Sequence, residues 1–191
     1  MTTVYFRDLN PSADIQIAQE QTLGNITGLV FKLMQERHAG LQFEINLANK
    51  GWTQIVTSTY NYETKLRYLN VNAYTHLIFG KTKFRFFVLG GPFFNRLLST
   101  SASEIPQDLE EDITFRFDKE SDNLWEIGLS GGGGFVLSTG IGEFQIEGKF
   151  NLGLTNIIKE TEDTDPSFSR SQSVEVVLHY LIPVFGKNKD Q

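Results

Sequence analysis

Strict alternation between apolar and polar residues is the feature that most limits how this chain can fold. Between residues 41 and 47, every odd position is Leu, Phe or Ile, and every even position is Gln, Glu or Asn. Successive side chains of a β-strand point to opposite faces, so this segment predicts a strand with one apolar and one polar face. A helix would spread the same apolar groups around its axis. The expected fold class is therefore all-β.

Seven segments of the chain have this strand character, and the links between them differ in length. The segments are residues 26–34, 41–47, 68–79, 84–98, 124–137, 144–154 and 174–185. Three links are only a few residues long, at 35–38, 80–83 and 138–142, whereas the others are longer, polar and mostly acidic. Up-and-down barrels of outer membranes have tight turns on the periplasmic side and longer loops outside. Tilted strands of about 9–12 residues also have the length needed to cross a bilayer core.

Seven is an odd number of strands, whereas single-chain bacterial barrels have an even number. Residues 3–8 have the pattern of the upper half of a strand and run into a long link at 9–23. We therefore expect residues 1–191 to form a single domain, an eight-stranded antiparallel up-and-down transmembrane β-barrel. Its first strand is expected to be truncated in this chain, with the other half of that strand and a signal peptide upstream. The last strand should then have an unpaired edge near residues 180–185.

A resemblance to a known family is carried by residues 144–157, which read FQIEGKFNLGLTNI. This segment is similar to the EGRYYxGLxNI motif of the PorT-like outer-membrane β-barrel family of Bacteroidetes-type bacteria. Three further stretches fit the family in order and spacing, namely 40–46 with 50–52, 68–81, and 85–87 with 91–92 and 97–99. The chain departs from the family pattern at Asn70, at Asn72 and at 149–150, where Lys-Phe stands in place of Arg-Tyr.

The resemblance implies an eight-stranded barrel that is exported to the outer membrane through a signal peptide. The namesake of the family is linked to secretion and gliding machinery. The resemblance supplies no catalytic residues.

The composition excludes several other classes of protein. The chain has a formal net charge of -6, and its acidic residues concentrate in segments 104–122 and 160–165. An acidic balance without a cluster of Lys and Arg argues against nucleic acid as a partner. Because there is no cysteine, the chain has neither a disulfide framework nor a thiolate metal ligand or nucleophile. No apolar run reaches the roughly 18–20 residues of a transmembrane helix.

No catalytic, cofactor-binding or metal-binding residue is predicted. His38 is expected in a periplasmic turn, while His76 and His179 are expected to point inward from different strands as space-filling residues. The acidic run at 108–112 lacks the turn glycine and ligand order of a calcium loop and is interpreted as solvated. The four glycines at 131–134 are followed by neither a helix nor a Lys-Ser/Thr pair, which excludes a phosphate loop. They are expected to mark a bend or a close approach of backbones.

Two further groups of residues have predicted places. Glu147 and Lys149 lie two residues apart on one inward face, where we expect an ion-pair network with Glu44 or Arg67 that helps to pack the lumen. Aromatic residues near strand ends are expected to form girdles at the membrane interfaces: Trp52, Phe79, Phe84, Trp125, Phe144, Tyr180 and Phe185.

The predicted function is that of a non-enzymatic envelope or secretion-associated component of the outer membrane. Eight strands leave room only for side chains in the lumen, so the protein is expected to act through its outer loops or its periplasmic turns. The surface segments of most interest are 9–23, 53–64, 100–123 and 158–173. The expected partners are outer-membrane lipid and envelope or secretion-machinery proteins, and no cofactor is expected.

A soluble lipocalin-like β-barrel that binds an apolar ligand is the alternative. A lipid-modifying barrel hydrolase is a third candidate, but the sequence has no visible nucleophile and base. The strands of a carrier and of a membrane barrel show the same alternation of apolar and polar residues. The two classes differ in whether the apolar face points into the barrel or out of it. Six apolar residues would line a cavity in a carrier and face outward as a band in a membrane barrel: Leu41, Phe43, Ile45, Phe144, Ile146 and Phe150.

Overall fold

The computed structural model describes residues 2–7, 19–34, 38–55, 61–102, 122–158 and 168–183. Within these ranges no helix is long and apolar enough to cross a membrane. The secondary structure of the described residues consists of nine strands: β1 (Thr2–Arg7), β2 (Gln19–Gln21), β3 (Ile26–Met34), β4 (Ala39–Ile55), β5 (Asn61–Phe79), β6 (Phe84–Ala102), β7 (Trp125–Ser138), β8 (Glu143–Gly153) and β9 (Phe168–Leu181). The all-β prediction is confirmed.

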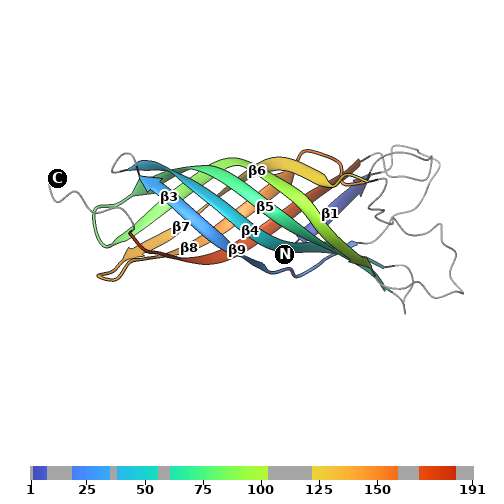
Figure 1. The fold of residues 1–191 in the computed structure, drawn as a ribbon, viewed down its shortest axis with the longest axis horizontal. Helices are drawn as coiled ribbons and strands as arrows, with labels where there is room; N and C mark the ends of the chain where they lie inside the picture. The colour runs from blue at the N-terminus through green and yellow to red at the C-terminus, as the bar shows by residue number, and fades with distance from the viewer. Residues whose placement is uncertain are drawn as a thin grey trace, which may run out of the picture.

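The strands β3 to β9 run up and down, and each is hydrogen-bonded antiparallel to the next. They are tilted and wind around one long axis, as Figure 1 shows. The two short strands extend this sheet at its ends. β2 pairs with the far end of β4, beyond the stretch that pairs with β3, and β1 pairs with the beginning of β9. The result is a single antiparallel sheet that curls around its own inner face.

A seam separates β3 from the second half of β9. β1 covers β9 as far as the pair Thr2↔Ser173, and among the described strands residues 175–181 pair only with β8. A hollow of about 330 Å³ lies in the seam, between Asn25 and Ile26 on one side and Val174 and Val176 on the other. The predicted unpaired edge is confirmed as far as Leu181, and it begins earlier than expected; residues 184 and 185 lie outside the described ranges.

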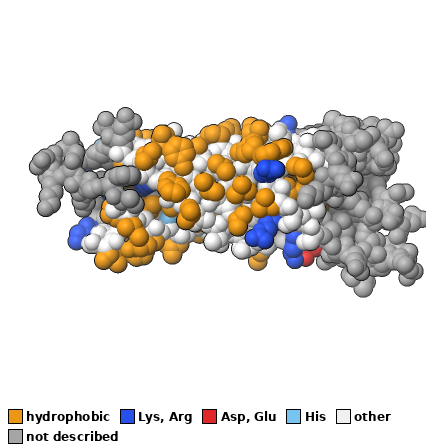
Figure 2. Space-filling view, in the orientation of Figure 1, with side chains coloured by type: hydrophobic (Ala, Val, Ile, Leu, Met, Phe, Trp, Pro, Cys, Tyr) orange, Lys and Arg blue, Asp and Glu red, His pale blue; other side chains and the backbone are white. Residues whose placement is uncertain are grey.

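The apolar face of the sheet points outward. The six residues that distinguish a carrier from a membrane barrel are all well exposed: Leu41 47%, Phe43 38%, Ile45 47%, Phe144 38%, Ile146 50% and Phe150 48%. In Figure 2 apolar side chains cover the middle of the barrel as a band. The alternative of a soluble carrier is therefore wrong, because the side chains that would bind its ligand are on the exterior.

The interior contains two clusters of buried apolar residues with polar side chains between them. One cluster, toward the long links, consists of Trp52, Leu66, Tyr68, Leu97 and Ile157. The other, toward the short turns, consists of Tyr74, Ile78, Phe87, Leu89 and Val136. The prediction that side chains fill the lumen is consistent with this arrangement.

Trp52 corrects the predicted aromatic girdles. It is 0% exposed and packs inside the barrel, because residues 42 to 52 continue one alternation in which every even position points inward. The described members Phe79, Phe84, Trp125, Phe144 and Tyr180 do face outward, as predicted. Some of these rings pair across neighbouring strands, as in Phe144 with Tyr180. Phe185 lies outside the described residues.

Three predicted links are shorter than expected, because the strands continue past the apolar band. β4 ends at Ile55 and β5 begins at Asn61, while β6 extends to Ala102 and β9 begins at Phe168. The predicted link 9–23 also contains β2. The outward side chains that the structure describes in these extensions are polar, as at Lys65, Ser101 and Arg170, so the alternation that predicts an amphipathic strand disappears there although the backbone pairing continues.

The four glycines of β7 lie in the middle of a regular strand, as predicted. A Cβ added at Gly134 would lie 1.9 Å from the carbonyl oxygen of Ile146, and one at Gly132 would lie 2.1 Å from that of Gly148. These two glycines therefore allow β7 and β8 to approach each other closely.

Candidate functional site in the barrel interior

A buried ion-pair cluster occupies the centre of the interior. Lys149 on β8 places its Nζ 2.7 Å from Glu44 Oε2 on β4 and 2.8 Å from Glu147 Oε1 on its own strand. All three side chains are 0–1% exposed. The predicted network of Glu147 and Lys149 with Glu44 is confirmed. Arg67 is not part of it, since its side chain is exposed on the outer face of β5.

Amide side chains extend the cluster toward the short turns. Gln42 Nε2 donates to Glu44 Oε1 at 2.8 Å and to Glu147 Oε2 at 3.0 Å. Gln145 Nε2 donates to Gln42 Oε1 at 3.0 Å and to Glu147 Oε2 at 2.8 Å. Lys32 Nζ on β3 donates to Gln145 Oε1 at 3.2 Å. The contacts join β3, β4 and β8 across the lumen, and so they hold the curled sheet together from within.

Asparagines extend the cluster in the opposite direction. Asn72 Nδ2 donates to Glu44 Oε2 at 3.0 Å, and Asn70 Nδ2 donates to Asn95 Oδ1 at 2.6 Å. Asn70 and Asn72 are joined at 2.8 Å. Asn95 Nδ2 donates in turn to Glu126 Oε2 at 2.8 Å, so the network reaches β7.

Glu126 forms the other end of this network. It accepts a hydrogen bond from Ser171 Oγ on β9, and Lys50 Nζ on β4 lies 3.6 Å from its Oε2. The lumenal network, as we call these linked side chains from Lys32 to Ser171, therefore contacts every long strand from β3 to β9. Each buried carboxylate in it has a cationic partner, which offsets the large cost of removing a charge from water.

Sequence reasoning identified the centre of the lumenal network but missed its ends. Glu126, Asn95 and Lys50 carried no motif that singled them out. Only their positions in the sequence could have identified them, because each residue occupies one of the alternating positions whose side chains point into the lumen, next to other polar residues at such positions. Which of these inward groups meet depends on the pairing of distant strands, as in Lys149 and Glu44, which are 105 residues apart.

The three histidines lie at the positions that the sequence predicted, and His179 in addition lies close to two carboxylates. His38 is exposed beside the short turn after β3, with Nδ1 3.2 Å from the carbonyl oxygen of Ile78. His76 is buried and stacks on Phe87 at 4.5 Å between ring centroids. His179 was expected only to fill space, but its Nε2 lies 3.6 Å from Glu147 Oε2 and 3.9 Å from Glu44 Oε1.

Glu44, Glu147 and His179 are a ligand set that a divalent cation accepts, because one donor atom from each lies within 4.8 Å of the others. The ammonium of Lys149 already lies between the two carboxylates and neutralises them. Its position favours a role for this group in packing over metal binding. The acidic run Asp108, Glu110, Glu111 and Asp112 lies outside the described residues.

Comparison with known proteins gives the chain a family. The family described as Outer membrane protein beta-barrel domain matches residues 4–159, which is most of the 191 residues. No curated protein and no solved structure shows a significant match. The matched range includes β3 to β8, the strands that carry most of the lumenal network. With an outward apolar band, a polar interior and up-and-down antiparallel strands, the chain belongs to the outer-membrane protein β-barrel domain family.

Proposed function

We propose that this protein is a PorT-like, non-enzymatic component of the outer membrane that supports the envelope or its secretion machinery through the segments outside the bilayer. The observation that carries the proposal is the lumenal network. Gln42, Glu44, Gln145, Glu147 and Lys149 are each at most 2% exposed and bonded to one another. Groups held in this way are not free to bind or attack a substrate. Recognition is therefore assigned to the ends of the barrel.

The secretion-associated role is tested by photo-crosslinking in intact cells. A photoreactive amino acid is placed at Ser58 or at Glu110, in the links after β4 and β6, and at Phe43 as a control that faces lipid. We expect protein adducts of defined mass from Ser58 or Glu110 and none from Phe43. In cells lacking the protein, a variant with both links exchanged for Gly-Ser segments should fail to restore secretion. Lack of adducts from both links, together with normal secretion in those cells, would contradict this role.

The non-enzymatic part of the proposal has its own test. The folded protein is incubated with phospholipid and with lipopolysaccharide, and released or transferred acyl chains are measured by mass spectrometry. We expect no turnover above that of the lipid alone. Turnover that disappears in the Glu44→Gln, Glu147→Gln double variant would overturn the proposal and assign chemistry to the interior.

We also propose that the complete barrel has eight strands. The support is the seam, because over residues 175–181 the backbone of β9 pairs with β8 on one side and with none of the described strands on the other. Unpaired backbone groups in lipid cost several kcal/mol each, roughly, so a spanning sheet closes on itself.

A further inference from the structure

The exterior of the barrel changes character over four adjacent rows of residues on β4, β5 and β6. Each row consists of directly paired, outward-facing residues. From the middle of the barrel toward the long links, the rows are Ile45–Val71–Phe94, Leu47–Leu69–Arg96, Asn49–Arg67–Ser99 and Gly51–Lys65–Ser101. The first row belongs to the apolar band, whereas the last two consist of glycine and polar residues. Leu98, in the β-bulge between Arg96 and Ser99, is 43% exposed and is the last apolar side chain on the outer face of β6 before them. The band therefore ends within two rows of Arg96.

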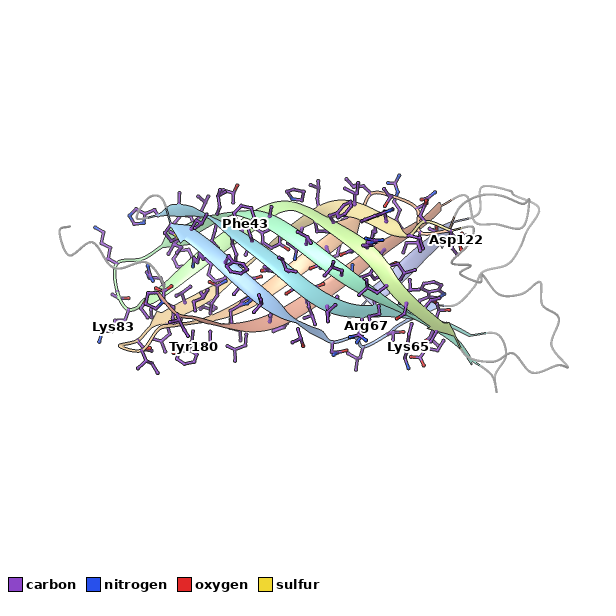
Figure 3. The ribbon with its side chains drawn as sticks, in the orientation of Figure 1. Phe43, Lys65, Arg67, Lys83, Asp122 and Tyr180 are labelled. Carbon is purple, nitrogen blue, oxygen red and sulfur yellow. The ribbon has the colours of Figure 1, made fainter. Side chains whose placement is uncertain are left out.

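The side chains beyond that limit form a basic surface that we call the basic rim: Lys65, Arg67 and Arg96 with Asn49, Ser99 and Ser101. All six are exposed. In Figure 3 Lys65 and Arg67 lie at the end of the barrel with the long links, whereas Lys83 and Tyr180 lie at the other end. Neighbouring positions across strands are about 5 Å apart and same-face positions along a strand about 7 Å apart, so these side chains reach a common point.

Two contacts define the edges of the basic rim. Lys65 Nζ lies 3.0 Å from Glu63 Oε2, but both side chains are open to solvent, with 59% and 36% of their area exposed. An ion pair of this kind contributes little and is easily exchanged for another anion. The guanidinium of Arg96 lies over the ring of Trp125, 4.9 Å from its centroid. Trp at the edge of an apolar band is typical of the membrane interface, which places Arg96 at headgroup level.

The surface between these side chains is hollowed. A depression of about 330 Å³ is lined by residues of β4, β5 and β6, including Asn49, Lys65, Arg67, Ser99 and Ser101. The segment between β2 and β3 forms its remaining wall, where Asn49 N donates to the carbonyl oxygen of Asn25 at 2.9 Å. The lining of the depression thus combines the exposed cations Lys65 and Arg67 with several hydroxyl and amide groups, and it also includes the exposed Leu23 and the buried Lys50.

We propose that the basic rim binds the phosphate group of a glycolipid in the outer leaflet, whose acyl chains lie along the apolar band below it. Guanidinium and ammonium groups with neighbouring hydroxyls match the oxygens of a phosphate. Continuity between the basic rim and the band selects a lipid phosphate over a free anion, because only an amphiphile contacts both surfaces. This inference rests on the proposed function, since it requires the long links to lie outside the cell.

Binding to bisphosphorylated lipid A tests the proposal. The folded protein in detergent micelles is titrated with this lipid, with the same lipid after removal of both phosphates, and with inorganic phosphate, and complexes are counted by native mass spectrometry. The Lys65→Gln, Arg67→Gln double variant is compared with Lys81→Gln, Lys83→Gln, which removes two exposed cations at the opposite end. Both pairs are exposed, so both variants should fold, and their migration on unheated gels verifies it.

We expect the rim variant to bind bisphosphorylated lipid A at least about tenfold more weakly than the wild type, because two charge-assisted contacts are lost. The control variant should bind like the wild type. Equal binding by all three proteins, equal binding of the dephosphorylated lipid, or inorganic phosphate bound as tightly as the lipid would each overturn the proposal. The crosslinks from Ser58 and Glu110 do not depend on the basic rim, so a failure of the lipid site and a failure of the proposed function give different results.

Discussion

Lys149 neutralises two carboxylates at once, and it does so from a position that is closed to water. Its Nζ contacts Glu44 and Glu147 at 2.7 and 2.8 Å, and it lies 5.2 Å from the centroid of the Tyr74 ring. A buried ion pair is weak evidence for net stability, but removing one partner leaves an uncompensated charge. Lys149 is therefore the single residue whose loss should disturb the interior most.

The Lys149→Met variant should unfold more easily than the wild type by about 3–5 kcal/mol, because two buried carboxylates lose their shared cation. Unfolding by urea in lipid vesicles, followed by tryptophan fluorescence, measures the difference. Lys83→Met, an exposed position in a short turn, is the matched control and should change stability by less than about 0.5 kcal/mol. Adding Glu44→Gln and Glu147→Gln to Lys149→Met should restore part of the loss. Wild-type stability in Lys149→Met would mean that the ion-pair cluster is unimportant for packing.

Individual residues also show where the sequence pattern was informative. Arg67 is an even number of residues from Leu69 and Val71 and so lies on the same outward face of its strand. Trp52 is an even number of residues from Gln42 and Glu44 and so lies on the same inward face. Continuing each alternation by a few residues would have placed both correctly. The predictions for these two residues were wrong because the strands were taken to end with the apolar band.

At the scale of the strand, β7 is unusual in its glycine content and β9 is unusual in its pairing with neighbouring strands. β7 carries four consecutive glycines, and two of them lie where a Cβ would meet the backbone of β8. β9 pairs with β1 over residues 168–173 and with β8 over residues 172–181, so among the described strands only residues 172 and 173 have partners on both sides. The first feature arises from side-chain size, and the second arises from the arrangement of the whole sheet.

A methyl group at Gly134 should weaken the contact between β7 and β8. Gly134→Ala places a Cβ 1.9 Å from the Ile146 carbonyl oxygen, so the strands must shift, at a cost of about 1–3 kcal/mol. In Gly131→Ala the nearest atom lies 3.9 Å away, and this control should change stability by less than about 0.5 kcal/mol. Urea unfolding of the two variants measures the difference. Equal stability of the two variants would show that the approach of the strands does not require glycine.

Hydrogen exchange should reveal the open edge of β9. Gln172 and Ser173 have strand partners on both sides, whereas residues 175–181 pair with β8 alone among the described strands, so that alternate amides there face the seam. We expect these alternate amides to exchange at least about tenfold faster than their neighbours in detergent-solubilised protein, as measured by NMR. Uniform protection along β9 would mean that another segment covers the edge under these conditions.

For the molecule as a whole, the direction of the apolar face decides its environment. The exterior band and the polar interior are the reverse of a soluble barrel, and the family match agrees with this orientation. Such a surface is stable only against acyl chains, because in water the exposed Leu, Ile and Phe side chains would associate. The same chemistry explains why polar residues such as Glu44 and Asn72 form the core of this protein.

A charge in the middle of the band should test this orientation. Ile45→Arg puts a cation among acyl chains and should cost about 2–4 kcal/mol in lipid vesicles, whereas Ser101→Arg, at the level of the long links, should cost at most about 1 kcal/mol. Urea unfolding in vesicles measures both values. If Ile45→Arg were as stable as Ser101→Arg, the band would not contact lipid.

The amino-acid sequence by itself determined the all-β class, the approximate position of every long strand and, within the apolar band, the side on which most residues of those strands lie. These properties depend on the local period of two, which any short segment reveals. Only the tertiary structure decided that Lys149 meets Glu44 rather than Arg67, that Asn49, Arg67 and Ser99 form one row, and that β1 pairs with β9 as far as Ser173. Each of these depends on the register between strands, and register is set by the whole curled sheet.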